Sequence, residues 1–218
     1  MIHAAGARGC REVILGIGGS ATTDAGCGMA QALGYRFFGA DGEEMSAGIR
    51  GDQLGGIARI DASDVPGHLR EVDVEVACDV RNPLYGENGA AHVYAPQKGA
   101  TPAQVEMLDA GLRHVAGLLE ELCGRRVRDI PGAGAAGGLG AGALAFLGAK
   151  LSPAIEIVLD AVRFDDALAG ADLVIAGEGK IDAQTGMGKV LHGVSARCEK
   201  AGVPMIAIAG VVDAGEKL

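Results

Sequence analysis

Three short segments combine glycines with hydroxyl, acidic or basic side chains, and each lies next to an apolar run. They are residues 16–24, 132–142 and 177–182. Glycine lets a backbone approach another group closely, and amides at the start of a helix carry the positive end of the helix dipole. Several such segments in one chain predict a protein that binds phosphate or another anion.

The first segment follows a predicted strand at residues 12–17, and a helix is expected from about Asp24 to Leu33. Backbone amides and short polar side chains at this junction suit an anionic ligand. The candidates for binding substrate or phosphate are Gly18, Gly19, Ser20, Thr22, Thr23 and Asp24. The alternative is that one of these polar side chains only caps the helix.

A second polar cluster follows an alternating apolar run at residues 72–78, which predicts a half-buried strand. Asp79 is a candidate catalytic residue and a candidate Mg²⁺ ligand, because both tasks need a fixed carboxylate. Arg81 and Asn82 are candidates for binding the substrate or its phosphate. The alternative is that Asp79 only forms a turn before Pro83.

The third segment is expected to be a loop at residues 177–187, between a strand at 172–176 and a helix at 188–201. Lys180 and Asp182 are candidate catalytic residues, and Asp182 is also a candidate metal ligand. Lysine neutralises a transferring phosphate, and carboxylates bind Mg²⁺. The further candidates for binding substrate or phosphate here are Gly177, Glu178, Gly179 and Lys189. The alternative is a solvated charged loop.

The order of the apolar runs predicts an α/β fold with a mostly parallel sheet and flanking helices. In the last third, a strand, a helix and a further strand at 204–209 give the βαβ order of a parallel sheet. Ligands of such sheets bind at the carboxyl ends of the strands, where the polar segments would lie. A further helix, capped by Thr101 with Pro102 in its first turn, is expected to end near Gly124.

Composition argues against several classes of function. The net charge is −9 and no block of Lys and Arg occurs, so nucleic acid is not an expected partner. Five scattered cysteines indicate free thiols in a cytoplasmic protein. Residues 132–149 are uncharged, but most of them are glycine or alanine. A buried loop and helix are therefore expected there, rather than a membrane span.

Two short patterns leave an NAD-dependent dehydrogenase open as an alternative. Residues 16–21 fit the GxGxxA dinucleotide pattern, and Asp41 follows at the spacing of a ribose-binding acid. Residues 138–143 fit the same pattern, so it is a weak signal in a chain with 37 glycines. A Walker-type phosphate loop is absent, because Ala183 stands where GxxxxGK needs its first glycine.

Longer motifs, taken in order, resemble those of the bacterial glycerate kinase family. They are residues 17–26 (IGGSATTDAG), 77–84 (ACDVRNPL), 89–91 (GAA), 96–100 (PQKGA), 131–141 (PGAGAAGGLGA) and 177–185 (GEGKIDAQT). Thr23 and Ala25 stand where this family usually has Asn and Gly. The resemblance covers nearly all 218 residues. The family's PDSFK and DGGEGT segments have no counterpart, so we expect an internal fragment that lacks the family's N- and C-terminal segments.

The resemblance implies transfer of the γ-phosphoryl group of ATP to D-glycerate, with 2-phosphoglycerate as the favoured product and ATP and Mg²⁺ as cofactors. It implies a Rossmann-like part built from residues 1–35 and 131–218, and a second α/β part built from residues 36–130. The expected partners are D-glycerate and ATP, without a membrane, and a homodimer is left open. A non-catalytic sugar-acid binding domain is a further alternative, because it would bind glycerate without consuming ATP.

Overall fold

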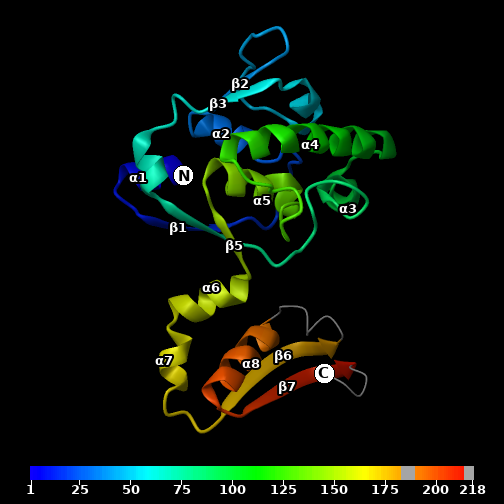
Figure 1. Cartoon of the computed structure of the whole chain (residues 1–218). Coiled ribbons are helices and arrows are strands. Elements are labelled where there is room, and N and C mark those ends of the chain that lie inside the picture. The colour runs from blue at the N-terminus through cyan, green and yellow to red at the C-terminus, as the bar shows by residue number, and fades with distance from the viewer. Residues whose placement is uncertain (183–189, 214–218) are drawn as a thin grey trace. The chain divides into compact units, whose positions relative to one another are not determined.

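Parallel strands with flanking helices make up the chain, which confirms the predicted α/β fold. The computed structural model describes residues 1–182 and 190–213. The chain divides into two units, residues 1–151 and residues 152–218 (Figure 1). Residues 36–130 thus pack in one unit with residues 1–35. The grouping of residues 1–35 with 131–218 into a Rossmann-like domain stays a prediction.

The first unit contains a sheet with the strand order β1-β4-β5. β1 (Glu12–Gly16) and β4 (Asp73–Ala77) run parallel, and Gly16 lies opposite Ala77 where the two strands end. β5 (Lys150–Ser152) is the other neighbour of β4. Because parallel strands end at the same edge, the polar segments that follow β1 and β4 leave the sheet at a common edge.

One face of this sheet packs against α5 (Ala135–Phe146). Val74 and Val76 from β4 are buried in one cluster with Ala143 from α5. The alternation that predicted a half-buried strand at 72–78 is therefore confirmed, since Asp73, between the buried Val72 and Val74, is exposed. Burial of such aliphatic side chains is the main force that holds helix and sheet together.

The longest described helix, α4 (Pro102–Cys123), confirms the prediction at both of its ends. Thr101 accepts a hydrogen bond from the Gln104 amide, and the Gln104 side chain accepts one from the Thr101 amide. Gly124, in a left-handed conformation that suits glycine, ends the helix. The fully buried residues of α4 include Leu112, Val115, Ala116 and Leu119.

Short elements complete the first unit. They are α1 (Ile2–Ala7), α2 (Cys27–Ala32), α3 (Ala90–Tyr94), the antiparallel strands β2 (Arg36–Phe38) and β3 (Arg59–Asp61), and the 3-10 helices η1 (Gly51–Gly56), η2 (Gly67–Glu71) and η3 (Pro96–Lys98). η1 and α3 both pack against α4 (Figure 1). These contacts gather the segments near residues 21–24, 49–52 and 95–100 around the first turns of α4.

The uncharged stretch at 132–149 forms a buried loop and a helix, as predicted. Its glycines allow close backbone contact. A Cβ atom on Gly137 would lie 2.0 Å from the Thr22 carbonyl oxygen, and one on Gly134 would lie 2.2 Å from the Pro83 carbonyl oxygen. The stretch therefore packs directly on the segments that follow β1 and β4. None of the described helices has both the length and the apolar character that crossing a bilayer requires.

The second unit confirms the βαβ order predicted for the last third. Two short helices, α6 (Ala154–Ala161) and α7 (Phe164–Leu168), precede β6 (Val174–Asp182), α8 (Val190–Ala201) and β7 (Met205–Asp213). β6 and β7 pair in parallel. The buried core between the helices and these strands includes Leu159, Leu168, Val194 and Cys198.

β6 is longer than the sequence predicted. The expected loop at 177–187 is wrong in its first part, because residues 177–182 continue the strand. Pairing with β7 runs through to Asp182. The partner strand explains the difference: β7 also continues, through Val211 and Val212, and β-branched residues favour an extended backbone. Each strand gives the other a pairing partner that a local glycine pattern does not reveal.

Candidate functional site

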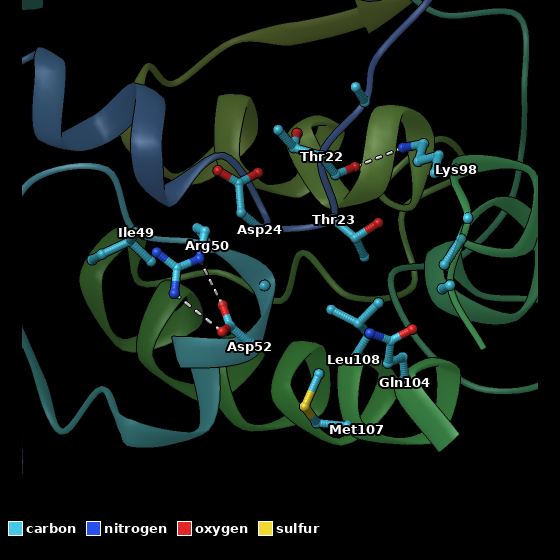
Figure 2. Close-up of a pocket in the computed structure, with 15 residues that line it drawn as sticks. Thr22, Thr23, Asp24, Ile49, Arg50, Asp52, Lys98, Gln104, Met107 and Leu108 are labelled. Atoms are coloured by element: carbon cyan, nitrogen blue, oxygen red, sulfur yellow. Dashed lines mark hydrogen bonds and ion pairs between the residues drawn. The ribbon is translucent and has the colours of Figure 1, made fainter. Parts of the chain in front are cut away.

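A cleft of about 410 Å³ lies in the first unit, beside the loop that follows β1. The loop residues Thr22, Thr23 and Asp24 line one side of it, and Met107 and Leu108 from α4 line the opposite side (Figure 2). A cleft of this volume suits a small molecule. Of the residues predicted from the sequence, these three loop residues line the cleft.

Lys98 holds the loop after β1 in place. Its Nζ donates a hydrogen bond to Ser20 Oγ at 3.0 Å. It donates another to the Thr22 carbonyl oxygen at 2.6 Å (Figure 2). Burial lowers the pKa of Lys98, while the negative charge of Asp24 acts in the opposite direction. Lys98 was not among the predicted site residues. From the sequence, residues 97–99 are equally compatible with a simple turn and with a ligand contact, and the PQKGA motif at 96–100 contributes to the family resemblance.

Asp24 has a structural task at the start of α2. It is buried, its Oδ1 accepts a hydrogen bond from the Gly26 amide, and its Oδ2 accepts one from the Gly28 amide, each at 3.1 Å. Both carboxylate oxygens thus serve amides at the beginning of a helix, which is the capping role kept as an alternative. A role for Asp24 in binding substrate stays a prediction.

Arg50 and Asp52 form an ion pair at another part of the cleft wall. Arg50 Nε lies 3.2 Å from Asp52 Oδ1, and Arg50 Nη2 lies 3.2 Å from Asp52 Oδ2 (Figure 2). Both side chains are exposed, so the pair adds little to stability. It does balance the charge of the guanidinium group. No sequence signal marked these residues, because the surrounding segment has no periodic pattern.

The polar cluster after β4 does not line the cleft. Asp79 and Arg81 are exposed beyond the end of the strand. Asn82 holds the backbone in place: its Nδ2 donates to the Asn88 carbonyl oxygen at 2.9 Å, and its Oδ1 accepts from the Tyr94 hydroxyl at 2.6 Å. Asn82 therefore ties the segment after β4 to α3. Catalytic or binding roles for these predicted residues stay predictions.

Gly18 and Gly19 form an exposed turn directly after β1. The dinucleotide pattern at 16–21 needs a helix that begins within it, whereas α2 begins only at Cys27. Asp41 accepts a hydrogen bond from the Glu43 amide in an exposed turn. This geometry does not support the dehydrogenase alternative.

The candidates of the second unit lie on β6 rather than on a loop. The strand includes Gly177, Glu178 and Gly179. Their backbone amides that face β7 take part in strand pairing and are therefore not free to bind phosphate. Lys180 Nζ lies 3.0 Å from Asp213 Oδ2 on the neighbouring strand. Asp182 is the last residue of β6, and Lys189 lies outside the described residues.

The sequence predicts Asp79 and Asp182 as ligands of a metal ion. Among the described residues, no group of three or more His, Cys, Asp or Glu side chains is placed to hold one. Mg²⁺ in phosphotransfer sites is commonly bound by one or two carboxylates together with substrate phosphates. Binding of Mg²⁺ by Asp79 or Asp182 stays a prediction.

Comparison with known proteins identifies the family. A model of the glycerate kinase family matches residues 1–218. The chain belongs to this family. Among curated members, glycerate kinase of Halalkalibacterium halodurans is 54% identical, and the alignment covers 95% of this chain and 54% of that protein. Glycerate 2-kinase of Escherichia coli (strain K12) is 46% identical, with coverage of 93% and 52%.

A solved structure supports the fold of this glycerate kinase family member. The crystal structure of a candidate glycerate kinase 2 from Salmonella typhimurium LT2 matches with a TM-score of 0.85 at 47% identity. The match covers 98% of this chain and 58% of that chain. The chain thus spans about half the length of the curated relatives that it matches.

Proposed function

We propose that this protein is an ATP-dependent glycerate kinase that forms 2-phosphoglycerate. The observation that carries the proposal is the family match over residues 1–218. The curated relatives named glycerate kinase, and the relative named glycerate 2-kinase, support the substrate and the position of the new phosphate. The cleft beside Thr22 and Lys98 supplies a place for a small polar acid.

Phosphoryl transfer depends mainly on positioning and charge neutralisation. In the proposed reaction, a glycerate hydroxyl oxygen bonds to the γ-phosphorus, and the bond to the β–γ bridging oxygen breaks to release ADP. Thr22 and Thr23 line the cleft and supply hydroxyls that can orient the acceptor. Asp79, at the carboxyl edge of β4 and outside the lining of the cleft, is the candidate from the sequence to accept the hydroxyl proton, a role that requires it to come within hydrogen-bond reach of that hydroxyl.

Neutralising the transferred phosphate needs cations, and Lys180 and Arg81 are the described candidates. Lys180 is half-exposed and ion-paired with Asp213, so a phosphate would replace that carboxylate as its partner. The exposed amides of Gly18 and Gly19 are candidates to contact phosphate oxygens. Mg²⁺, held by Asp79 or Asp182 together with the phosphates of ATP, would supply further charge neutralisation.

A sugar-acid binding protein without catalysis is the second candidate. The observation that favours it is that, among the described residues, those that line the cleft all lie between residues 21 and 108. Binding of an acid therefore does not require segments that only the longer relatives contain. A cytoplasmic location and a homodimer stay predictions from the sequence.

The decisive experiment is incubation with ATP, Mg²⁺ and D-glycerate, followed by ³¹P NMR to identify any phosphoglycerate. It should be run on residues 1–218 and on a chain extended to the length of the relatives, with glycerol as a control acceptor. We expect the extended chain to produce 2-phosphoglycerate and not to phosphorylate glycerol at a comparable rate. Absence of product from both chains would contradict the proposal, and binding of glycerate without product would favour the second candidate.

A further inference from the structure

We propose that Lys98 binds the carboxylate of the three-carbon acid in the cleft, together with backbone amides of residues 22–24. The proposal rests on the proposed function for the identity of the acid. It assigns Lys98, which the sequence analysis left outside the site, as a substrate-binding residue.

The donors of Lys98 are only partly used. An ammonium group has three N–H donors, and two of them point to Ser20 Oγ and the Thr22 carbonyl oxygen. Both acceptors are uncharged. Within the described part of the chain, no carboxylate forms an ion pair with Lys98. One N–H donor of the ammonium group is therefore available to an anion in the cleft, because both oxygens of the nearby Asp24 carboxylate accept hydrogen bonds from the Gly26 and Gly28 amides.

The other charged groups that line the cleft already have partners. Arg50 is paired with Asp52 through two contacts, each of 3.2 Å. Asp24 accepts hydrogen bonds from the Gly26 and Gly28 amides. Lys98 is thus the cleft residue whose charge would gain most from a negatively charged ligand.

The loop beside Lys98 offers additional donors. In the described residues, the backbone amides of Thr22, Thr23 and Asp24 donate no hydrogen bond. Thr23 and Asp24 are buried, at 8% and 7% exposure. The amides of this loop are therefore available to an oxygen of a ligand in the cleft that residues 22–24 line. A carboxylate has two oxygens and can accept from the ammonium group and from an amide at once.

The remaining wall of the cleft favours a small monoanion over a nucleotide. Ile49, Met107 and Leu108 make part of the lining apolar, which strengthens a charge-assisted hydrogen bond nearby. The remaining donor of Lys98 suits one carboxylate oxygen of a small acid. A triphosphate carries several negative charges and would need more cations than the cleft provides.

The test compares D-glycerate with glyceramide, its uncharged amide, by NMR titration of the ¹⁵N-labelled chain. In the wild type we expect the Thr22, Thr23 and Asp24 amide signals to shift with D-glycerate. We also expect glyceramide to bind at least about tenfold more weakly, as for loss of a hydrogen bond to a charged group. Lys98→Gln keeps a donor for the loop and removes the charge, and it should weaken glycerate binding about tenfold without changing glyceramide binding.

Lys150→Gln is the matched control, because Lys150 is exposed, pairs with Glu75 and does not line the cleft. It should bind both compounds like the wild type. Three results with the wild-type chain would overturn the proposal: no binding of either compound, equal binding of both, or shifts only of amide signals outside residues 22–24. These results do not depend on whether Lys98→Gln folds. The proposal is also overturned if folded Lys98→Gln binds glycerate as tightly as Lys150→Gln does.

Kinetics of the extended chain separate this proposal from the proposed function. Lys98→Gln should raise KM for D-glycerate about tenfold and leave KM for ATP unchanged. Product formation with an unchanged KM for D-glycerate would overturn the role of Lys98 and leave the kinase assignment intact. Glycerate binding that depends on Lys98, without any phosphoglycerate, would support the role of Lys98 and overturn the kinase assignment.

Discussion

Residues 16–24 and residues 132–142 are both rich in glycine, and the fold uses their glycines for different purposes. In the first segment, Gly18 and Gly19 are exposed, and no atom lies within 4 Å of the place where a Cβ would stand. In the second, a Cβ on Gly137 would overlap the Thr22 carbonyl oxygen at 2.0 Å. Glycine exposes the backbone in the first segment and lets two backbones touch in the second.

The difference shows what a glycine pattern does and does not report. It marks backbone that needs space or unusual torsion angles, but it does not report whether a ligand, a neighbouring loop or a paired strand fills that space. Residues 177–182 add the third outcome, because their glycines lie in a strand that pairs with β7. Of the three segments, the first alone contributes residues that line the cleft.

The largest expected effect comes from adding a methyl group within residues 132–142, where glycines lie in close contact with neighbouring backbone. Gly137→Ala should lower the free energy of unfolding of the first unit by about 3 kcal/mol or more. Its Cβ would overlap the Thr22 carbonyl oxygen, and its φ of 73° disfavours alanine. Chemical denaturation followed by circular dichroism measures the change. A loss below about 1 kcal/mol would mean that the close contact is not important for stability.

The next largest effect is expected for Glu120, which binds the backbone at residues 127–128, just before the segment 132–142. Glu120 accepts hydrogen bonds from the Val127 and Arg128 amides at 3.0 and 3.2 Å, and it pairs with the Arg128 guanidinium group. These interactions lower the pKa of Glu120 to about 2, with the Arg128 side chain as the largest cause. Glu120→Gln should therefore lower the free energy of unfolding by about 2 kcal/mol at pH 7.

The pH dependence of that variant has a definite sign. A carboxylate with a lowered pKa stabilises the fold above its unfolded pKa, near 4.5, and loses this contribution as the pH falls towards about 2. The stability difference between wild type and Glu120→Gln should thus shrink over that interval. Denaturation midpoints at several pH values measure it. A difference that is constant between pH 7 and pH 3 would contradict the assigned interaction.

Substitution of Lys180 tests the third glycine segment, residues 177–182. In an extended chain that forms phosphoglycerate, Lys180→Ala should lower kcat by at least about tenfold, if Lys180 neutralises the transferred phosphate. Lys200→Ala, in the last turn of α8, is the control for loss of a positive charge in the same unit. Steady-state kinetics with ATP and D-glycerate measure both. Equal kcat values for the two variants would remove Lys180 from the catalytic candidates.

The smallest effect is expected in residues 16–24, where Gly18 is exposed. Gly18→Ala should change the free energy of unfolding by no more than about 0.5 kcal/mol, because the added methyl group meets no neighbouring atom. It is also the matched control for Gly137→Ala, since both add one methyl group to a glycine-rich segment. A loss as large as that of Gly137→Ala would remove the contrast between the two segments.

The helices and strands were largely predictable because their signals are local. The cap at Thr101 and the glycine at 124 give the two ends of α4, and alternation at 72–78 gives β4. The residues that line the cleft were only partly predictable. The candidates Thr22 and Thr23 line the cleft. Lys98, which bonds to Thr22 across 76 residues, had no local pattern that linked it to them.

The extension of β6 was not predictable for a related reason. Residues 177–182 contain two glycines and three charged side chains, which is the composition of a loop. Strand pairing with β7 overrides that preference, because the hydrogen-bonding partner comes from a distant part of the chain.

The amino-acid sequence by itself determined the family, the α/β order of the elements and the capped helix at 102–123, since each depends on motifs or spacings along the chain. Tertiary structure alone decided which glycines are exposed, which are packed and which are paired in a strand. It also decided that Lys98 joins Thr22 at one cleft. These properties depend on the distances between groups that lie far apart in the sequence, and only the packed chain fixes such distances.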